Sequence, residues 1–269
     1  MERCLLLRAG VRLCVARVGQ GQTFIFQHGL CGDAHQPADV FPLGIGWQCQ
    51  TLECAGHGLS GPAAPGTVSI AGFAADVAAM IEAEKLGPIV LGGISMGAAI
   101  ALHLAVRRPG LVRGLVLARP AWVDQAAPAN MRPNAEAGAL LAGHAPDEAR
   151  RLFEVSATAR QLAQEAPDNL ASLLGFFSRQ PHDVTADLLQ RISADGPGVR
   201  EAEIRALALP VLVIGHARDH VHPLEYAQRL AGMVTGARLA IITPKAESPA
   251  QYRSDFRGAL GTFLKEFDA

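Results

Sequence analysis

The sequence lacks a strong excess of charge of either sign. Its 269 residues include 24 Lys or Arg and 25 Asp or Glu, so the formal net charge is -1. Charges this evenly balanced and interspersed give no basic surface of the kind that binds nucleic acid or an anionic membrane. We therefore expect a small-molecule substrate, no nucleic acid and no membrane. The sequence does not decide between a monomer and a homo-oligomer.

Cysteines are few and do not form a recognisable pattern. The five cysteines contain no CxxC pair, and an odd number is a poor framework for disulfides. We expect buried free thiols, no metal site and no cofactor. Residues 1–10 have only three consecutive leucines and no small-residue cleavage pattern, so we do not expect a secretory signal. We expect a cytoplasmic location.

Only one apolar run approaches the length of a membrane span, at residues 86–106. It is interrupted by Gly92, Gly93 and Ser95 and carries His103. A short strand, a glycine turn and a helix fit this run better than one continuous span.

Strand and helix patterns alternate along most of the chain. The composition is 49% apolar, enough for one large core. An opening hairpin is expected at 4–17. Further strands are expected at 22–27, 47–53, 89–91, 115–118, 211–214 and 238–242, and helices at 69–84, 98–107, 224–233 and 248–266. Short, nearly all-apolar strands between helices predict a mainly parallel sheet covered on both faces, an α/β fold.

The segment between the strand at 115–118 and the strand at 211–214 is different, because its strand patterns vanish. Helices are expected at 146–163 and 169–177, broken by prolines. We predict core segments at 1–122 and 205–269 and a helical cap at 123–204, over the carboxyl ends of the strands. A packing module without ligand contact is the alternative.

A G-x-S-x-G pattern, Gly93-Ile94-Ser95-Met96-Gly97, lies between an apolar strand and an apolar helix. A direct strand-to-helix turn forces the serine into a strained conformation and leaves room only for glycine two residues to either side. The serine hydroxyl then projects above the sheet, where the helix N-terminus can stabilise an oxyanion. Ser95 is therefore the predicted nucleophile.

At this point the chain resembles the α/β-hydrolase superfamily over nearly its whole length outside the cap. His28-Gly29-Leu30 is similar to the family's oxyanion loop, which implies that the backbone amides of Leu30 and Met96 hold the oxyanion, with His28 beside the substrate. Residues 53–60, ECAGHGLS, resemble the family's D-x-R-G-H-G-x-S turn with glutamate and alanine substituted. His57 in this turn is interpreted as structural.

The resemblance also implies which residue is the acid of a serine–acid–histidine triad. It further shows that the family's usual histidine position is not occupied by histidine. The loop at 215–223, GHARDHVHP, is similar to the family's G-x-x-x-D-x-x-x-P loop, so Asp219 is the matched acid. The family's histidine follows the last strand, where this chain has Ala246-Glu247-Ser248-Pro249 instead. A serine hydroxyl needs a base within hydrogen-bond reach.

Several residues are candidates for that base. His222 lies on the same loop as Asp219 and titrates near neutral pH, but a loop-stabilising role fits it equally well. His220 has less room to reach past Asp219. Glu247 stands where the imidazole would be, although a carboxylate needs a raised pKa to act as a base. His144 in the cap is a further possibility.

Two other residues are expected near the substrate. Arg119 follows the strand at 115–118, where it can either bind a substrate carboxylate or phosphate or anchor the cap by an ion pair. Trp122, at the start of the predicted cap, is also expected to contact the substrate.

Two classes of function follow from these patterns. The first is a serine hydrolase that acts on a carboxylic ester or lactone through an acyl-enzyme, because these substrates demand the weakest base. The second is a degenerate protein of the same fold that binds a small ligand without hydrolysis, because the usual histidine position carries Glu247. The retained pair of Ser95 and Asp219 favours the hydrolase.

Overall fold

The computed structural model describes residues 1–63 and 67–268. Within them the sheet has eight strands in the order β1-β2-β4-β3-β5-β6-β7-β8. The strands are β1 Glu2–Arg8, β2 Val11–Gly19, β3 Gln22–Gln27, β4 Trp47–Leu52, β5 Ile89–Ile94, β6 Val112–Ala118, β7 Val211–Gly215 and β8 Arg238–Ile241. Strand β2 pairs antiparallel with β1 and β4, and all other pairings are parallel. The predicted α/β class is confirmed.

The helices connect these strands and form a separate group between β6 and β7. They are α1 His35–Val40, α2 Ile70–Ala83, α3 Met96–Arg107, α4 Arg132–Gly143, α5 Pro146–Glu154, α6 Ala157–Glu165, α7 Pro167–Phe176, α8 His182–Ala194, α9 Glu201–Arg205, α10 Leu224–Met233 and α11 Pro249–Leu264. The single helix expected at 146–163 is two helices, α5 and α6. The chain breaks at Ser156, whose hydroxyl accepts from the Ala159 amide as the N-cap of α6.

Alternation along the strands creates a core on each face of the sheet. Ile25, Leu91 and Val213 belong to the cluster that includes α2, α3 and α10. Phe24 and Val90, one position away, belong to the cluster that includes α11. Successive side chains of a strand point to opposite faces, so a sheet covered on both sides needs apolar residues at nearly every position.

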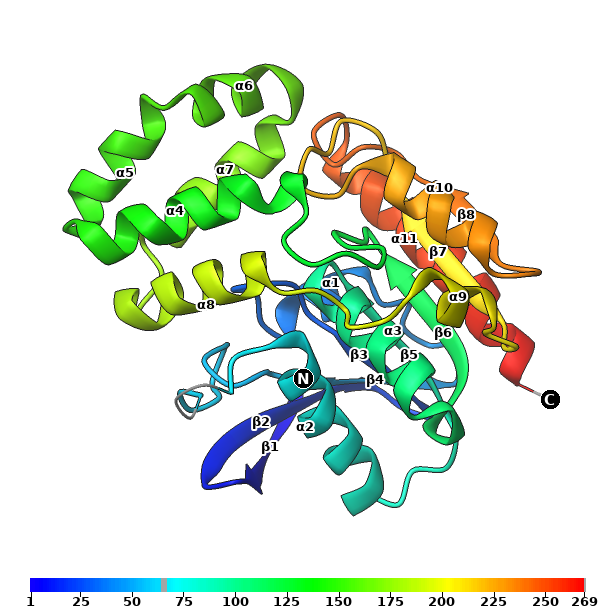
Figure 1. Ribbon diagram of the computed structural model, residues 1–269. Coiled ribbons are helices and arrows are strands. Elements are labelled where there is room, and N and C mark those ends of the chain that lie inside the picture. The colour runs from blue at the N-terminus through cyan, green and yellow to red at the C-terminus, as the bar shows by residue number, and fades with distance from the viewer. Residues whose placement is uncertain (64–66, 269) are drawn as a thin grey trace.

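Helices α4 to α8 lie together beside the sheet core (Figure 1). They have an apolar cluster of their own, which includes Phe153, Leu162 and Leu189. Helix α9 lies apart from this group, against α10. The chain therefore leaves the sheet after β6, builds a second small core, and returns to form β7.

Among the described residues, no helix is both long enough and apolar enough to cross a membrane. The apolar run at 86–106 is the buried strand β5 followed by α3, as its glycines predicted.

Candidate active site

Ser95 lies in the turn between β5 and α3, in a backbone conformation that side chains rarely adopt. Its φ is +57°, and the next residue begins the helix. A Cβ atom on Gly93 would lie 2.1 Å from the carbonyl carbon of Gly97, and one on Gly97 would lie 2.4 Å from the backbone oxygen of Gln27. The two glycines are thus required by close backbone contacts on both sides of the serine.

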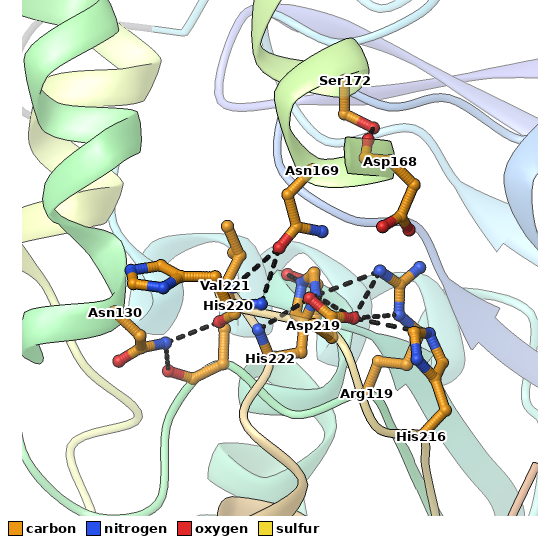
Figure 2. Close-up of polar contacts among 12 residues, drawn as sticks. Arg119, Asn130, Asp168, Asn169, Ser172, His216, Asp219, His220, Val221 and His222 are labelled. Carbon is orange, nitrogen blue, oxygen red and sulfur yellow. Dashed lines mark hydrogen bonds and ion pairs between the residues drawn. The ribbon is translucent and has the colours of Figure 1, made fainter. Parts of the chain in front are cut away.

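The structure brings Ser95 together with a histidine and an aspartate. The distance from His222 Nε2 to Ser95 Oγ is 2.8 Å. On the other side of the ring, His222 Nδ1 lies 2.9 Å from Oδ1 and 3.0 Å from Oδ2 of Asp219 (Figure 2). With the proton on Nδ1, the imidazole donates to Asp219 and accepts from the serine hydroxyl. This is the geometry of a hydrogen-bonded Ser-His-Asp chain.

One loop supplies both the aspartate and the histidine. Asp219 and His222 follow β7, and the His222 amide donates to Asp219 Oδ1 at 3.0 Å. Asn169, from α7, accepts the amides of His220 and Val221 through one oxygen, at 2.8 and 3.0 Å. Asn130 Nδ2 donates to the Val221 carbonyl at 2.6 Å. Side chains from the helical segment between β6 and β7 therefore fix the loop from outside (Figure 2).

Arg119 is bound to the carboxylate of Asp219. Its Nε and Nη2 donate to Asp219 Oδ2 at 2.9 and 2.6 Å, and Nη2 lies 3.2 Å from His222 Nδ1. Arg119 is 9% exposed and Asp219 8% exposed, so this is a buried ion pair. The sequence predicted that Arg119 would either bind an anionic group of the substrate or anchor the cap by an ion pair. The structure instead places the guanidinium on Asp219, because both lie at the carboxyl ends of the neighbouring strands β6 and β7.

Burial and neighbouring charges shift the pKa values of Asp219 and His222. Burial raises the pKa of Asp219, but the Arg119 guanidinium and His222 outweigh it and hold that pKa well below its usual range. Burial lowers the pKa of His222; Asp219 offsets part of this effect and Arg119 adds to it. At neutral pH the site therefore contains an ionised carboxylate and a neutral imidazole.

Ser95 lines a small cavity. Its volume is about 110 Å³, and its lining comes mainly from the loop after β3, the turn between β5 and α3, the loop after β7 and the helices α4 and α7. The polar side chains that line it are those of Gln36, Ser95, Arg119, Asn134, Asn169, Ser172, His222 and Lys245. Lys245 comes from the loop after β8, the position at which the family's histidine was expected. That loop therefore contributes a lysine side chain, and not a histidine, to the lining of the cavity.

Several residues predicted for the site lie elsewhere. The Glu247 side chain is about half exposed and lies 3.9 Å from Arg218, so the geometry does not support it as the base. Trp122 is buried in the core, and its indole donates to the Asp195 carbonyl at 2.9 Å. His28 is fully buried with both ring nitrogens on backbone groups, Gly29 O and Cys54 N. Neither Trp122 nor His28 lines the cavity with Ser95.

The other histidines considered as a base also have different partners. His144 Nδ1 lies 3.6 Å from Glu148 at the end of α4, and His220 Nδ1 lies 3.5 Å from Glu165. His57 is fully buried and in ring contact with His28. Cys31 follows Leu30 directly, but burial raises the pKa of its thiol to about 12, which disfavours it as a nucleophile at neutral pH.

Sequence reasoning did not identify the asparagines that hold the loop. Asn130 and Asn169 are each more than nine-tenths buried, although asparagine is normally a surface residue. Their positions in the helical segment gave no signal of contact with the loop at residues 220 and 221, which lies about 90 positions after Asn130 and about 50 positions after Asn169.

Comparison with known proteins agrees with this fold. The sequence model of the alpha/beta hydrolase fold family matches residues 22–246, most of the chain. The chain therefore belongs to the α/β-hydrolase family, as its motifs predicted.

Individual relatives are named as hydrolases. The chain is 32% identical to a 2-hydroxymuconate semialdehyde hydrolase of Pseudomonas sp. strain CF600 over 198 residues, which are 71% of this chain and 66% of that protein. The solved structure of an N-acyl homoserine lactone degrading enzyme matches with a TM-score of 0.70 and 24% identity, over 95% of this chain and 99% of that one. An esterase of Exiguobacterium antarcticum matches with a TM-score of 0.74 and 18% identity, over 97% and 98%.

Proposed function

We propose that the protein is a serine hydrolase that cleaves a carboxylic ester or lactone of a small molecule. The observation that carries this proposal is the 2.8 Å contact between His222 Nε2 and Ser95 Oγ, with Asp219 on the opposite ring nitrogen. A buried neutral imidazole beside a serine hydroxyl in the nucleophile turn supports turnover over passive ligand capture. The site needs no histidine after β8.

The proposed first half-reaction forms an acyl-enzyme. Ser95 Oγ attacks the substrate carbonyl carbon while its proton passes to His222 Nε2, and Asp219 stabilises the resulting imidazolium. The backbone amides of Leu30 and Met96 are the proposed donors to the oxyanion, and Met96 is the first residue of α3. The tetrahedral intermediate collapses when the imidazolium protonates the leaving alkoxide oxygen.

Water completes the proposed cycle. The neutral His222 removes a proton from water, which attacks the acyl carbon, and Ser95 leaves with the proton that His222 returns. Arg119 is proposed as a positioning residue, because it fixes the carboxylate that orients the imidazole. It does not touch the serine.

The helices between β6 and β7 are proposed as a cap over this chemistry. Asn134 and Met131 from the α4 region, and Leu173 and Phe176 from α7, line the cavity with Ser95. A cap of this kind excludes water from the oxyanion and selects the acyl group. Esters and lactones are preferred over amides as substrates, because an alkoxide leaving group demands less of the base. The names of the lactone-degrading and esterase neighbours are consistent with this preference.

A panel of short-chain esters and lactones tests the proposal. Hydrolysis is followed by acid release at constant pH, with Ser95→Ala as the matched control. The proposal predicts saturable hydrolysis of at least one ester or lactone by the natural protein and none above background by the variant. Equal rates for the two proteins would show that Ser95 is not the nucleophile.

A further inference from the structure

The sheet ends on one side in strand β1, Glu2–Arg8, whose outer edge pairs with no strand among the described residues. Figure 1 shows β1 at the margin of the molecule, beyond β2. An edge strand leaves the N–H and C=O of every second residue unpaired, so it can add another strand. We propose that β1 pairs antiparallel with β1 of a second copy of this chain and forms a dimer interface.

Two leucines make this edge apolar as well as unpaired. Leu5 is 64% exposed and Leu7 72% exposed, and they share one face of β1 because they lie two residues apart. Arg3 belongs to the same face, but its Nη1 donates to the buried carboxylate of Glu53 at 3.0 Å. The exposed part of this face is therefore apolar, and such an edge favours association with another strand.

Several features that usually protect an edge strand are missing from β1. Residues 2–8, ERCLLLR, contain no proline and no lysine. All seven residues pair with β2 in one unbroken register, without a bulge. At the opposite edge of the sheet, β8 is only four residues long. Strand β1 is thus the longer of the two edges and the one better suited to pairing.

The turn after β1 decides which backbone groups point outward. Ala9 and Gly10 both have positive φ, +48° and +81°, as in the two-residue turn of a tight hairpin. Arg8 and Val11, which flank this turn, are then a hydrogen-bonded pair. The alternation of the ladder directs the N–H and C=O groups of residues 2, 4, 6 and 8 to β2. Those of residues 3, 5 and 7 point outward and are available to a second strand.

One symmetric register pairs the whole strand. In a two-fold antiparallel pair, full overlap of residues 2–8 puts Leu5 opposite Leu5 of the second copy, both with outward backbone groups. Glu2 then lies opposite Arg8 of the second copy, and this occurs at both ends of the interface. Strand length alone selects this register, and the opposite charges then match, which favours a second copy as the partner. A shift by two residues in either direction loses both charge pairs.

Two-fold pairing also closes the assembly. Each copy uses its own β1, so the same edge is covered in both copies and the two eight-stranded sheets become continuous. Pairing of β1 with β8 of another copy would instead leave one free edge at each end and continue as a filament. The inferred assembly is therefore a dimer.

Sedimentation velocity at protein concentrations up to about 100 μM tests the inference. The natural protein should sediment as a dimer. Leu5→Lys puts two like charges opposite each other at the two-fold axis and removes apolar contact, so it should weaken dimerisation at least about tenfold. Val155→Lys is the matched control, because Val155 is 68% exposed but lies between α5 and α6. A natural protein that stays monomeric, or a Leu5→Lys variant that dimerises as well as the control, would overturn the inference.

Exchange of the two end charges tests the register. Glu2→Arg and Arg8→Glu each place like charges opposite each other, so each should weaken the dimer, by about two- to tenfold. The double variant carries both changes, restores opposite charges at both ends, and should regain the natural dissociation constant within about twofold. A double variant no tighter than the single variants would overturn the pairing of β1 with itself. Association is measured without substrate, so these results do not depend on the proposed hydrolysis.

Discussion

Asp219 and His222 lie three residues apart on one loop, and the His222 imidazole contacts both the Asp219 carboxylate and the Ser95 hydroxyl. The carboxylate and the imidazole are thus positioned together by the sequence that follows β7. Residues after β8 are not needed for this arrangement, which explains how the site tolerates Glu247 where a histidine was expected. The loop in turn depends on Arg119, Asn130 and Asn169 for its shape.

The first prediction concerns the base. Replacing His222 with Gln keeps a similar size but removes the proton acceptor, so kcat/KM for a hydrolysed ester should fall roughly 10²–10⁴-fold. His220→Gln, two residues away and turned toward Glu165, should change kcat/KM by less than about threefold. Steady-state kinetics with both variants, supported by matching circular dichroism spectra, checks this. Equal losses in the two variants would contradict the assignment.

The second prediction concerns Glu247. Its carboxylate is half exposed and has a weak contact with Arg218, so Glu247→Gln should leave kcat/KM within about twofold. The same kinetic assay measures it. A tenfold loss would restore Glu247 as a candidate base.

The third prediction concerns pH. Because burial, reinforced by Arg119 and only partly offset by Asp219, lowers the pKa of His222, the imidazole stays neutral to a lower pH than in solution. The acid limb of kcat/KM should therefore lie below a pH of about 6.5, the ordinary value for histidine. Arg119→Met removes the cation 3.2 Å from Nδ1 and should move this limb to higher pH.

A pH profile of kcat/KM for the natural protein and both arginine variants tests the third prediction. Arg205→Met is the matched control, because Arg205 is exposed and, among the residues that the structure describes, pairs only with Glu201. Its profile should overlay that of the natural protein. A limb that stays in place when Arg119 is replaced would mean that the guanidinium does not tune the base.

The fourth prediction concerns the turn that carries Ser95. A methyl group on Gly97 would overlap the backbone of Gln27, so Gly97→Ala should lower the free energy of unfolding by roughly 1–3 kcal/mol or more. Gly110→Ala is the control, since nothing lies within 4 Å of its added Cβ. Urea denaturation of both variants measures the difference. A Gly97→Ala variant as stable as the control would show that the turn shifts enough to accommodate the methyl group.

The sequence predicted the sheet well because its signals are local. Apolar strands such as Ile89–Ile94, followed by a glycine turn and an apolar helix, have few alternatives in a chain of this length. The position of Ser95 followed from the same turn. The order of Ser95 before Asp219, together with the family resemblance, indicated the acid.

The choice among the candidate bases, of which His222 was one, and the partner of Arg119 were beyond sequence reasoning for a physical reason. Whether His222 reaches Ser95 depends on the conformation of residues 216–223, which distant asparagines fix. The direction of the Arg119 side chain depends on a carboxylate 100 residues away. Side chains of this kind are placed by tertiary contacts that no local pattern encodes.

Labelling by a fluorophosphonate probe tests the central claim most directly. The rate of modification is read by intact mass and the site by peptide mapping, in the natural protein and in the Ser95→Ala, His222→Gln and Glu247→Gln variants. The account predicts labelling at Ser95 in the natural protein and in Glu247→Gln, none in Ser95→Ala, and a large loss of rate in His222→Gln. An unlabelled natural protein after hours of exposure, or a His222→Gln variant that labels at the natural rate, would contradict it.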